Sequence, residues 1–395
     1  MFVVLGASEL HRAAEWASLP LELRTAPWGF VALPIGAPAA EALRWATVVA
    51  ASFALVGLFT RAAVAVTAAL LLLVLALPQQ WGAGVHTHHL LWFTLLLAAS
   101  PCGDALSIDA WRARLRPAPA EAYGIPVRAA WLCIGLIFFF PGFWKLATQG
   151  LGWALSDNLV HQLHFKWLEH GVVPAVRLDR HPLLLKAGGL GVLALELSFV
   201  ALVLVRRARP FAVAAALGFH AATRAFFLIG FSSLWACYVV FAPWSRWVGA
   251  REHGEPSRRS PWPAALMAVL VLGGVALAGA RGLEHGWPFA CYPTFRHDPG
   301  ASAPVLVAEE ELADGARREL PLGFLRGDSG QKEWSAMWHL LSAPRPEALR
   351  AWWEAHRADR SGVVAVRFFA GGVAADPDAA ADAPVRRALL AEVRL

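Results

Sequence analysis

The chain has 395 residues, of which 57% are hydrophobic and 16% are charged, with a net charge of +6 and a mean hydropathy of +0.48. A soluble domain carries about 25% charged residues, so this composition excludes an ordinary soluble protein and indicates a membrane protein. The 19 Trp against 3 Tyr agree with this, because indoles are common at bilayer interfaces. The arginines fall in short loops between apolar runs, which is a topology pattern and not a nucleic-acid footprint.

Long apolar segments occupy the first part of the chain. A helix needs about 20 apolar residues to cross a bilayer. We predict eight spans, at residues 40–59, 61–78, 88–102, 128–147, 184–205, 211–228, 229–244 and 262–280. The third and seventh are short and are expected to tilt or to extend into their flanks. Residues 1–280 are therefore predicted to form a mainly α, polytopic transmembrane helical bundle in the lipid bilayer.

The C-terminal part has a different composition. From Arg281 the charge rises, and the runs APVLVAEEEL and GVVAVRFF predict strands, while PEALRAWWEAHRADR predicts an amphipathic helix. Residues 281–395 are expected to form a small α+β domain outside the membrane. Its first stretch, GWPFACYPTF, is aromatic, which is typical of an interfacial belt.

Basic residues are distributed unevenly between alternate loops. The loops at 111–128, 206–209 and 246–259 are rich in arginine, whereas the loop before residue 88 has no basic residue and the long loop at 147–183 has three. The positive-inside rule places the arginine-rich loops in the cytoplasm. We therefore predict an integral protein of the cell inner membrane with an extracytoplasmic C-terminal domain.

The cysteines and the N-terminus point to no further feature. The four cysteines lie in separate segments without CxxC spacing, so we predict neither a zinc site nor a disulfide framework. The histidines of HTHH lack carboxylate or cysteine companions at ligand spacing, so no metal site is predicted. The apolar start MFVVLGA is short and lacks a basic leader, so no cleavable signal is expected.

Three ionisable residues fall at informative depths in the predicted spans. Lys145 follows the aromatic run FFFPGFW near the outer end of its helix. Glu196 lies about 16 Å below the outer side, and His220 lies about 15 Å from the inner side of the next helix, at 1.5 Å per residue. A carboxylate at the centre of a membrane helix costs about 3 kcal/mol on insertion scales, which favours a functional or paired role. We expect Glu196 and His220 to face each other within reach of a hydrogen bond or one water.

Other polar residues fall in the same outer half. His86 and His88 stand at the outer start of one helix, Arg224 follows His220 by four residues, and Trp153 lies in the outer loop. Together these groups predict a polar cavity. Taken singly, Lys145 could instead snorkel to the interface, His220 could be a satisfied core histidine, and Arg224 could neutralise Glu196.

Four motifs occur in an order that resembles a known family. HTHHLLWFTLLLAASPCGDALSIDAW, FFFPGFWKLATQGLGW, LELSF and GFHAATRAFFLIGFSSLW resemble the vitamin K-dependent gamma-carboxylase family, whose shared membrane part is the horizontally transferred transmembrane (HTTM) domain. The resemblance covers about residues 20–250. It implies that Lys145 is the base that deprotonates reduced vitamin K. It also implies catalytic roles for His88, Glu196 and His220.

The resemblance implies the chemistry as well. Reduced vitamin K or another membrane quinol would be oxygenated to an epoxide, with O2 and CO2 as co-substrates, and CO2 would add to a glutamyl or small substrate in a lyase reaction. We expect the cofactor to contact His86, Trp144, Trp153 and Arg224. A buried lysine suits the role of base, because desolvation favours the uncharged amine.

Two other classes of function stay open from the sequence. One is a non-catalytic membrane protein that acts as a scaffold, or whose outer domain binds an extracytoplasmic protein or peptide. The other is a haem or metal protein that uses His88 and His220 as ligands on two helices. Quinol turnover separates the first alternative from an enzyme, and an absorption spectrum tests the second.

Overall fold

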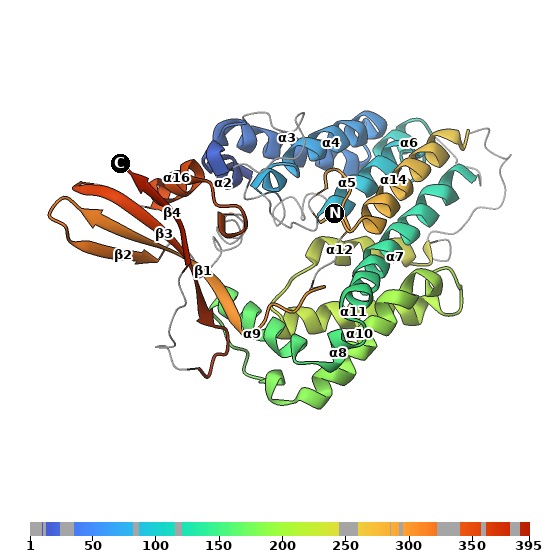
Figure 1. The fold of residues 1–395 in the computed structure, drawn as a ribbon. Helices are drawn as coiled ribbons and strands as arrows, with labels where there is room; N and C mark the ends of the chain where they lie inside the picture. The colour runs from blue at the N-terminus through green and yellow to red at the C-terminus, as the bar shows by residue number, and fades with distance from the viewer. Residues whose placement is uncertain are drawn as a thin grey trace.

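The computed structural model is a bundle of helices with a four-stranded antiparallel sheet at one end (Figure 1). The structure describes residues 10, 13–23, 35–81, 87–114, 121–244, 260–284, 286–291, 295–321, 340–356, 361–379 and 388–395. Helices dominate the chain and the strands are confined to its C-terminal part, which confirms the mainly helical fold class.

The described helices, with 3-10 turns marked η, have the following bounds in chain order: α2 Ala13–Ala17, η1 Leu21–Leu23, α3 Ala37–Val56, α4 Thr60–Val74, η2 Pro78–Trp81, α5 His88–Ala98, α6 Ile108–Arg112, α7 Glu121–Gln149, α8 Gly152–Leu155, α9 Asn158–His170, η3 Leu178–Arg180, α10 Pro182–Leu202, α11 Arg209–Phe226, α12 Ser232–Cys237, η4 Tyr238–Phe241, α14 Trp262–Ala280 and α16 Pro346–His356.

Five of the described helices are long and apolar enough to cross a membrane, which indicates an integral membrane protein. They are Ala37–Val56, Thr60–Gln80, Ala122–Gln149, Pro182–Leu202 and Trp262–Ala280. Each coincides with a predicted span. The count of eight is not confirmed, because α5 and the α12–η4 pair are short and α11 is less apolar, since it carries two arginines and a histidine.

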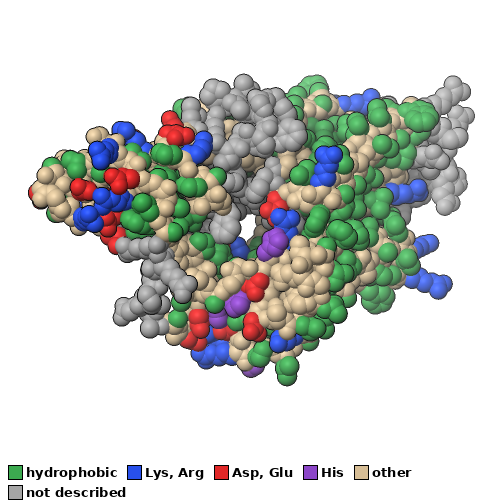
Figure 2. All heavy atoms as spheres, viewed as in Figure 1, with side chains coloured by type: hydrophobic (Ala, Val, Ile, Leu, Met, Phe, Trp, Pro, Cys, Tyr) green, Lys and Arg blue, Asp and Glu red, His purple; other side chains and the backbone are tan. Residues whose placement is uncertain are grey.

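The surface of the molecule separates the bundle from the sheet. Figure 2 shows hydrophobic side chains over the bundle and mixed charges over the sheet. Large apolar side chains on the outside of the bundle, such as Phe53, Leu266 and Val269, are 40%, 62% and 68% exposed. An apolar surface of this extent is unusual on a soluble monomer, so lipid is its natural partner.

Helix α7 lies at the centre of the bundle and packs against both α10 and α14. Glycines allow the close contact: a Cβ added at Gly135 would lie 2.8 Å from the side chain of Val200, and one added at Gly142 would lie 2.7 Å from the Cβ of Glu196. Membrane helices commonly use small residues in this way, because close van der Waals packing drives their association.

The C-terminal sheet has the strand order β2-β1-β3-β4 and is antiparallel throughout. Its strands are β1 Ser302–Leu312, β2 Arg317–Pro321, β3 Val363–Ala374 and β4 Ala388–Arg394. Trp352 and Trp353 of α16 are fully buried in its core. The same buried cluster contains Trp16 and Leu77, so the sheet is packed against the end of the bundle.

Two described basic segments, α6 with Arg112 and the turn that leads into α11, lie at the end of the bundle away from the sheet (Figure 1). Asp109 accepts a hydrogen bond from the backbone N of Thr60 at 2.7 Å, which joins the first tight turn to the segment around α6. The guanidinium of Arg209, at the start of α11, lies 3.8 Å from the ring centroid of Trp131 on α7. The arginines of these two described segments therefore share one end of the fold, and the loop at 246–259 lies outside the described residues.

Candidate functional site

A buried ion pair joins the two central helices α7 and α10. Nζ of Lys145 lies 2.5 Å from Oε1 of Glu196, and each residue is only 3% exposed. Two charges removed from water lose their hydration, and their attraction offsets that loss only when the contact is close. The amine of Lys145 therefore points into the bundle, and the snorkelling alternative does not describe it.

The sequence PGFWK explains how the pair forms. Gly142 stands one turn before Lys145, so the two share a face of α7. Because Gly142 has no side chain, Glu196 can lie directly against α7: an added Cβ would lie 2.7 Å from its Cβ and 3.2 Å from its Oε2. A larger residue at this position would displace the carboxylate from the amine.

An indole covers the amine of Lys145. The Nζ atom lies 4.8 Å from the ring centroid of Trp153, a cation–π distance. Nε1 of Trp153 donates to the backbone O of Phe295 at 2.6 Å. Phe295 belongs to the segment that leads from the bundle to the sheet, so Trp153 links that segment to Lys145.

The pair faces an apolar cavity of about 540 Å³. This volume falls in the range of roughly 300–1,000 Å³ that is typical of small-molecule sites. The side chains in its lining that carry polar atoms are His89, Lys145, Trp153, Glu196, His220 and Thr223. The structure thus brings together three of the four predicted catalytic residues, and with them one predicted cofactor contact, Trp153.

His220 shares the cavity wall, but its hydrogen bond goes elsewhere. Its Nε2 lies 3.1 Å from Oη of Tyr238, and its ring lies 5.2 Å from that of Phe231. No direct hydrogen bond joins His220 to Glu196 in the described structure, but both side chains line the same cavity, so the predicted contact through one water stays a prediction. Lys145 is bonded to one oxygen of Glu196, and Tyr238, one of three tyrosines in the chain, is bonded to Nε2 of His220.

The outer histidines are arranged differently from the prediction. His88 does not line the cavity: its Nε2 lies 3.0 Å from the backbone O of Gly286, and its ring lies 5.0 Å from that of Trp287. The adjacent His89 lines the cavity instead, because successive helical residues point about 100° apart. His86 lies outside the described residues.

The haem and metal alternative gains no support from this arrangement. Since His88 is not part of the cavity wall, it does not face His220 across the cavity. Among the residues that the structure describes, no three His, Cys, Asp or Glu side chains gather where they could hold a metal ion.

Two predicted cofactor contacts lie away from the cavity. Trp144 donates Nε1 to a backbone carbonyl of α14 at 2.8 Å, and Arg224 is exposed, with Nη1 3.4 Å from the backbone O of Leu228. Neither lines the cavity. The cavity-facing side of α11 runs through Thr223, and Arg224, one residue on, is rotated away by about 100°.

The sequence reasoning missed four residues of the site: Gly142, His89, Tyr238 and Phe295. A signal existed for two of them. Gly142 precedes Lys145 by three residues and so had to share its helical face. Tyr238 is a rare hydroxyl in a chain with 19 Trp and 22 Phe, so its presence in an apolar segment indicated a hydrogen-bond partner.

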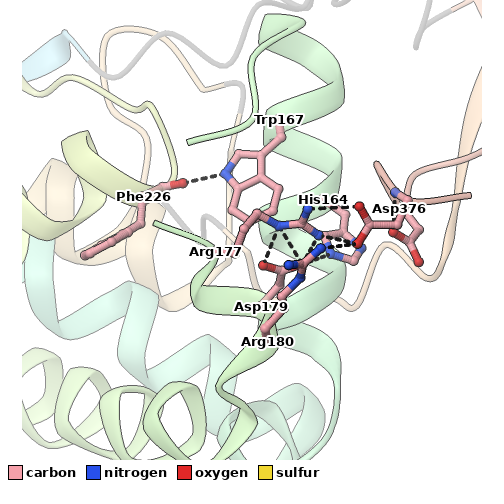
Figure 3. A network of polar contacts seen from close by, with 8 residues as sticks. His164, Trp167, Arg177, Asp179, Arg180, Phe226 and Asp376 are labelled. Carbon is pink, nitrogen blue, oxygen red and sulfur yellow. Dashed lines mark hydrogen bonds and ion pairs between the residues drawn. The ribbon is translucent and has the colours of Figure 1, made fainter. Parts of the chain in front are cut away.

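A second polar network lies beside α9 (Figure 3). Nη2 of Arg177 lies 2.7 Å from Oδ2 of Asp179 and 2.7 Å from Oδ2 of Asp378, and Nε2 of His164 lies 3.0 Å from Oδ2 of Asp179. Burial raises the pKa of Asp179, but the hydrogen bonds from Arg177 and His164 outweigh it and hold that pKa at about 2. The network ties the loop after β3 to α9 and η3 of the bundle.

This network also reaches the cavity wall. The guanidinium of Arg177 lies 5.6 Å from the ring centroid of Trp167, and Nε1 of Trp167 donates to the backbone O of Phe226 at 2.7 Å (Figure 3). Phe226, at the end of α11, lines the cavity. The sheet is thus connected to the cavity here as well as through Trp153.

Comparison with known proteins gives one match. Residues 31–244, more than half of the chain, match the family model of the HTTM domain. Neither the curated proteins nor the solved structures include a match. The matched segment contains Lys145, Glu196 and His220, whereas the outer sheet lies beyond it.

Proposed function

The chain belongs to the HTTM domain family, and on that premise we propose that it is a membrane enzyme in which Lys145 and Glu196 perform acid–base chemistry on a membrane quinol. The observation that carries the proposal is the 2.5 Å contact between these two side chains in the wall of an apolar cavity. Buried, paired ionisable groups beside a cavity are the usual composition of a catalytic centre.

The pair suits proton transfer within a membrane. An ammonium beside a carboxylate is neutral overall, and so is an amine beside a carboxylic acid, so one proton can move between the two groups without leaving net charge in the apolar interior. With Glu196 ionised, Lys145 as the free amine can accept a proton from a ligand hydroxyl, so that the pair becomes neutral and the negative charge passes to the ligand oxygen. Glu196 can then share that proton through the existing hydrogen bond.

The cavity fits a ring with polar substituents and an apolar tail. Among the described residues, Oε2 of Glu196 and Nδ1 of His220 are buried without a hydrogen-bond partner, and both side chains line the cavity. A quinol hydroxyl placed there would satisfy such atoms, which otherwise carry a desolvation penalty of about 1–3 kcal/mol each. When bound, reduced vitamin K or another membrane quinol would supply the four electrons that reduce O2, two by its oxidation to the quinone and two by epoxidation of the ring double bond.

The reaction that we propose is quinol epoxidation, in which quinol and O2 give the quinone epoxide and water. Its coupling to carboxylation, in which a C–H proton is removed and CO2 takes its place on a glutamyl or small substrate, is the fuller form of the same proposal. In both forms this chain contributes the base, Lys145, and its partner Glu196. His89 and His220 are placed to orient the ring.

We propose an orientation as well: the arginine-rich end lies in the cytoplasm, and the sheet lies outside the inner membrane, where it could meet a protein or peptide. The positive-inside rule supports this, because the described basic segments at α6 and at the start of α11 lie at one end of the fold. A reporter fused after Leu395 should be active only if it folds outside the cytoplasm. Activity of a cytoplasm-only reporter at the same position would reverse the orientation.

The test of the enzymatic proposal is a substitution that keeps the charge. Lys145→Arg and Lys145→Ala should both insert and fold, and both should lose quinol-dependent O2 consumption by at least about a hundredfold, the scale of a general base. Arginine fails because it cannot be deprotonated at accessible pH. Lys186→Arg, on the first turns of α10 and away from the cavity lining, is the matched control and should keep turnover.

The same turnover measurements test the alternative that the protein is a non-catalytic scaffold. Partial rescue of Lys145→Ala by a small exogenous amine would support the assignment of the base. Near-normal turnover in Lys145→Arg would refute that assignment. Absence of quinol turnover in the wild-type protein would favour a scaffold whose bundle carries the outer sheet.

A further inference from the structure

The cavity is exposed on one side only. Most of its lining residues are buried or half-buried, including the ion pair and His220. The lining residues that are exposed are Leu184, Gly188, Gly191, Ala215, Gly218 and Ala222. All six lie on α10 and α11, so the cavity opens between these two helices.

The opening is bordered by small residues with free space around them. A Cβ added at Gly188, Gly191 or Gly218 would meet no atom within 4 Å. This contrasts with Gly142 and Gly189, whose added Cβ atoms would lie 2.7 Å and 2.8 Å from neighbouring side chains. Glycines at packed helix crossings have a structural role, whereas those at the opening leave a gap that nothing in the described chain fills.

The gap faces lipid. Helix α10 is one of the five apolar helices long enough to span a membrane, and most of its surface is not buried within the molecule. At its outer end, by contrast, the cavity is covered by Trp153 and Phe295, which are joined by a 2.6 Å hydrogen bond. Access from the membrane is therefore more direct than access from the aqueous side.

The inner part of the cavity requires a polar group. Glu196 and His220 are 3% and 2% exposed, and Oε2 of the first and Nδ1 of the second have no hydrogen-bond partner among the described residues. An apolar ligand would leave both atoms unsatisfied, and a fully polar ligand would not remain in the lipid outside. The ligand that matches both ends is amphipathic.

We infer that the gap between α10 and α11 is a lateral portal, through which a lipid-soluble ligand with a polar ring and a flexible apolar tail enters from the bilayer. The ring lies at Glu196 and His220, and the tail lies over Gly188, Gly191 and Gly218 toward lipid. The identity of the ring as a quinone rests on the proposed function, but the portal rests on the exposure and the glycine geometry described above.

The test is photolabelling with a naphthoquinone that carries a short saturated tail ending in a diazirine. In wild-type protein in nanodiscs, the label should attach to peptides of α10 and α11 and should be displaced by excess untagged tailed quinone. The double variant Gly191→Leu/Gly218→Leu fills the portal without a clash and should lower this labelling by about tenfold or more. Gly273→Leu on α14 is the matched control, because its added Cβ also meets no atom within 4 Å, and it should label like wild type.

Several outcomes would overturn the portal. Label spread evenly over lipid-facing helices such as α3 and α14 would do so, as would a double variant that labels like Gly273→Leu. Menadione, which lacks a tail, should compete in the double variant as well as in wild type, and a loss of both ligands would indicate a collapsed cavity and not a blocked tail. Labelling at the portal in a protein without quinol turnover would refute the proposed function and leave the portal intact.

Discussion

The bundle and the sheet each contain a carboxylate that is almost completely buried, and the two differ in their hydrogen bonds. Glu310 of β1 is fully buried: its Oε2 accepts from Nε and Nη2 of Arg318 at 2.9 Å and 2.7 Å, and its Oε1 accepts from Nε1 of Trp353 at 2.7 Å. Glu196 of α10 is bonded through Oε1 alone: its Oε2 is buried without a hydrogen-bond partner among the described residues, and the side chain lines a cavity. A carboxylate with both oxygens bonded stabilises a fold, whereas one with an unpartnered oxygen beside a cavity can still accept a hydrogen bond from a ligand.

The largest expected effect is a difference in enzymatic activity between variants of Glu196 and Glu310. Glu196→Gln should lower quinol-dependent O2 consumption by at least about a hundredfold, because an amide cannot accept the proton that Lys145 passes on. Glu310→Gln should leave turnover near the wild-type value. It should instead destabilise the sheet by about 1.5–3 kcal/mol, the range for a hydrogen bond to a charged group.

Oxygen consumption and hydrogen exchange of the β1 and β3 amides measure the two effects in the same preparations. Faster exchange in Glu310→Gln with retained turnover would sharpen the contrast. Equal loss of turnover in both variants would break it, since the sheet would then be needed for catalysis and not only for the fold.

The next prediction concerns the glycine that admits Glu196 to α7. Gly142→Ala places a Cβ 2.7 Å from that of Glu196, so α7 and α10 must separate, at a cost of about 1–3 kcal/mol for overpacking. Turnover should fall as well, because the separation lengthens the contact between Glu196 and Lys145. Gly273→Ala, with no atom within 4 Å of its added Cβ, should unfold at the wild-type temperature or slightly above it in a thermal scan in detergent. A Gly142→Ala variant as stable and active as Gly273→Ala would show that the close contact between α7 and α10 does not require glycine at this position.

Much of the fold could be predicted because its elements are long and uniform. Each of the five apolar helices extends over enough residues for its composition to decide its state, and the change at Arg281 separated the strands from the bundle. The short helices α5 and α12 are not confirmed as spans, since an apolar run in the sequence does not show where its helix ends. Hydropathy gives the type of an element more securely than its length.

The sequence predicted how far along their helices the site residues lie, but not the direction in which their side chains point. Counting residues placed Lys145, Glu196 and His220 in one cavity, and the structure holds them there. The hydrogen-bond partners of these residues could not be predicted, because the position of a residue along a helix does not fix the direction of its side chain. A rotation of about 100° between neighbours is enough to exchange His88 for His89 and to turn Arg224 away from the cavity.

The smallest expected effect comes from removing the ion pair between Asp378 and Arg177. This pair is exposed, in contrast to the buried Lys145–Glu196 pair. The side chain of Asp378 is 52% exposed, so solvent screens the contact, and Asp378→Asn should destabilise the docked sheet by less than about 1 kcal/mol. High salt should weaken this contact and leave the buried pair unaffected. Proteolysis of the 376–379 loop at low and high salt would measure both effects.

The acid dependence of this network follows from Asp179, whose pKa is held at about 2 against an ordinary value of 3.8. A carboxyl group with a lowered pKa in the folded protein stabilises it above its unfolded pKa, and that stabilisation is lost as the pH falls through the folded value. The docking of the sheet through Arg177 should therefore be constant from neutral pH down to about 4 and should weaken between about 4 and 2. Loss of protection of the 376–379 loop already at pH 5 to 6 would contradict this.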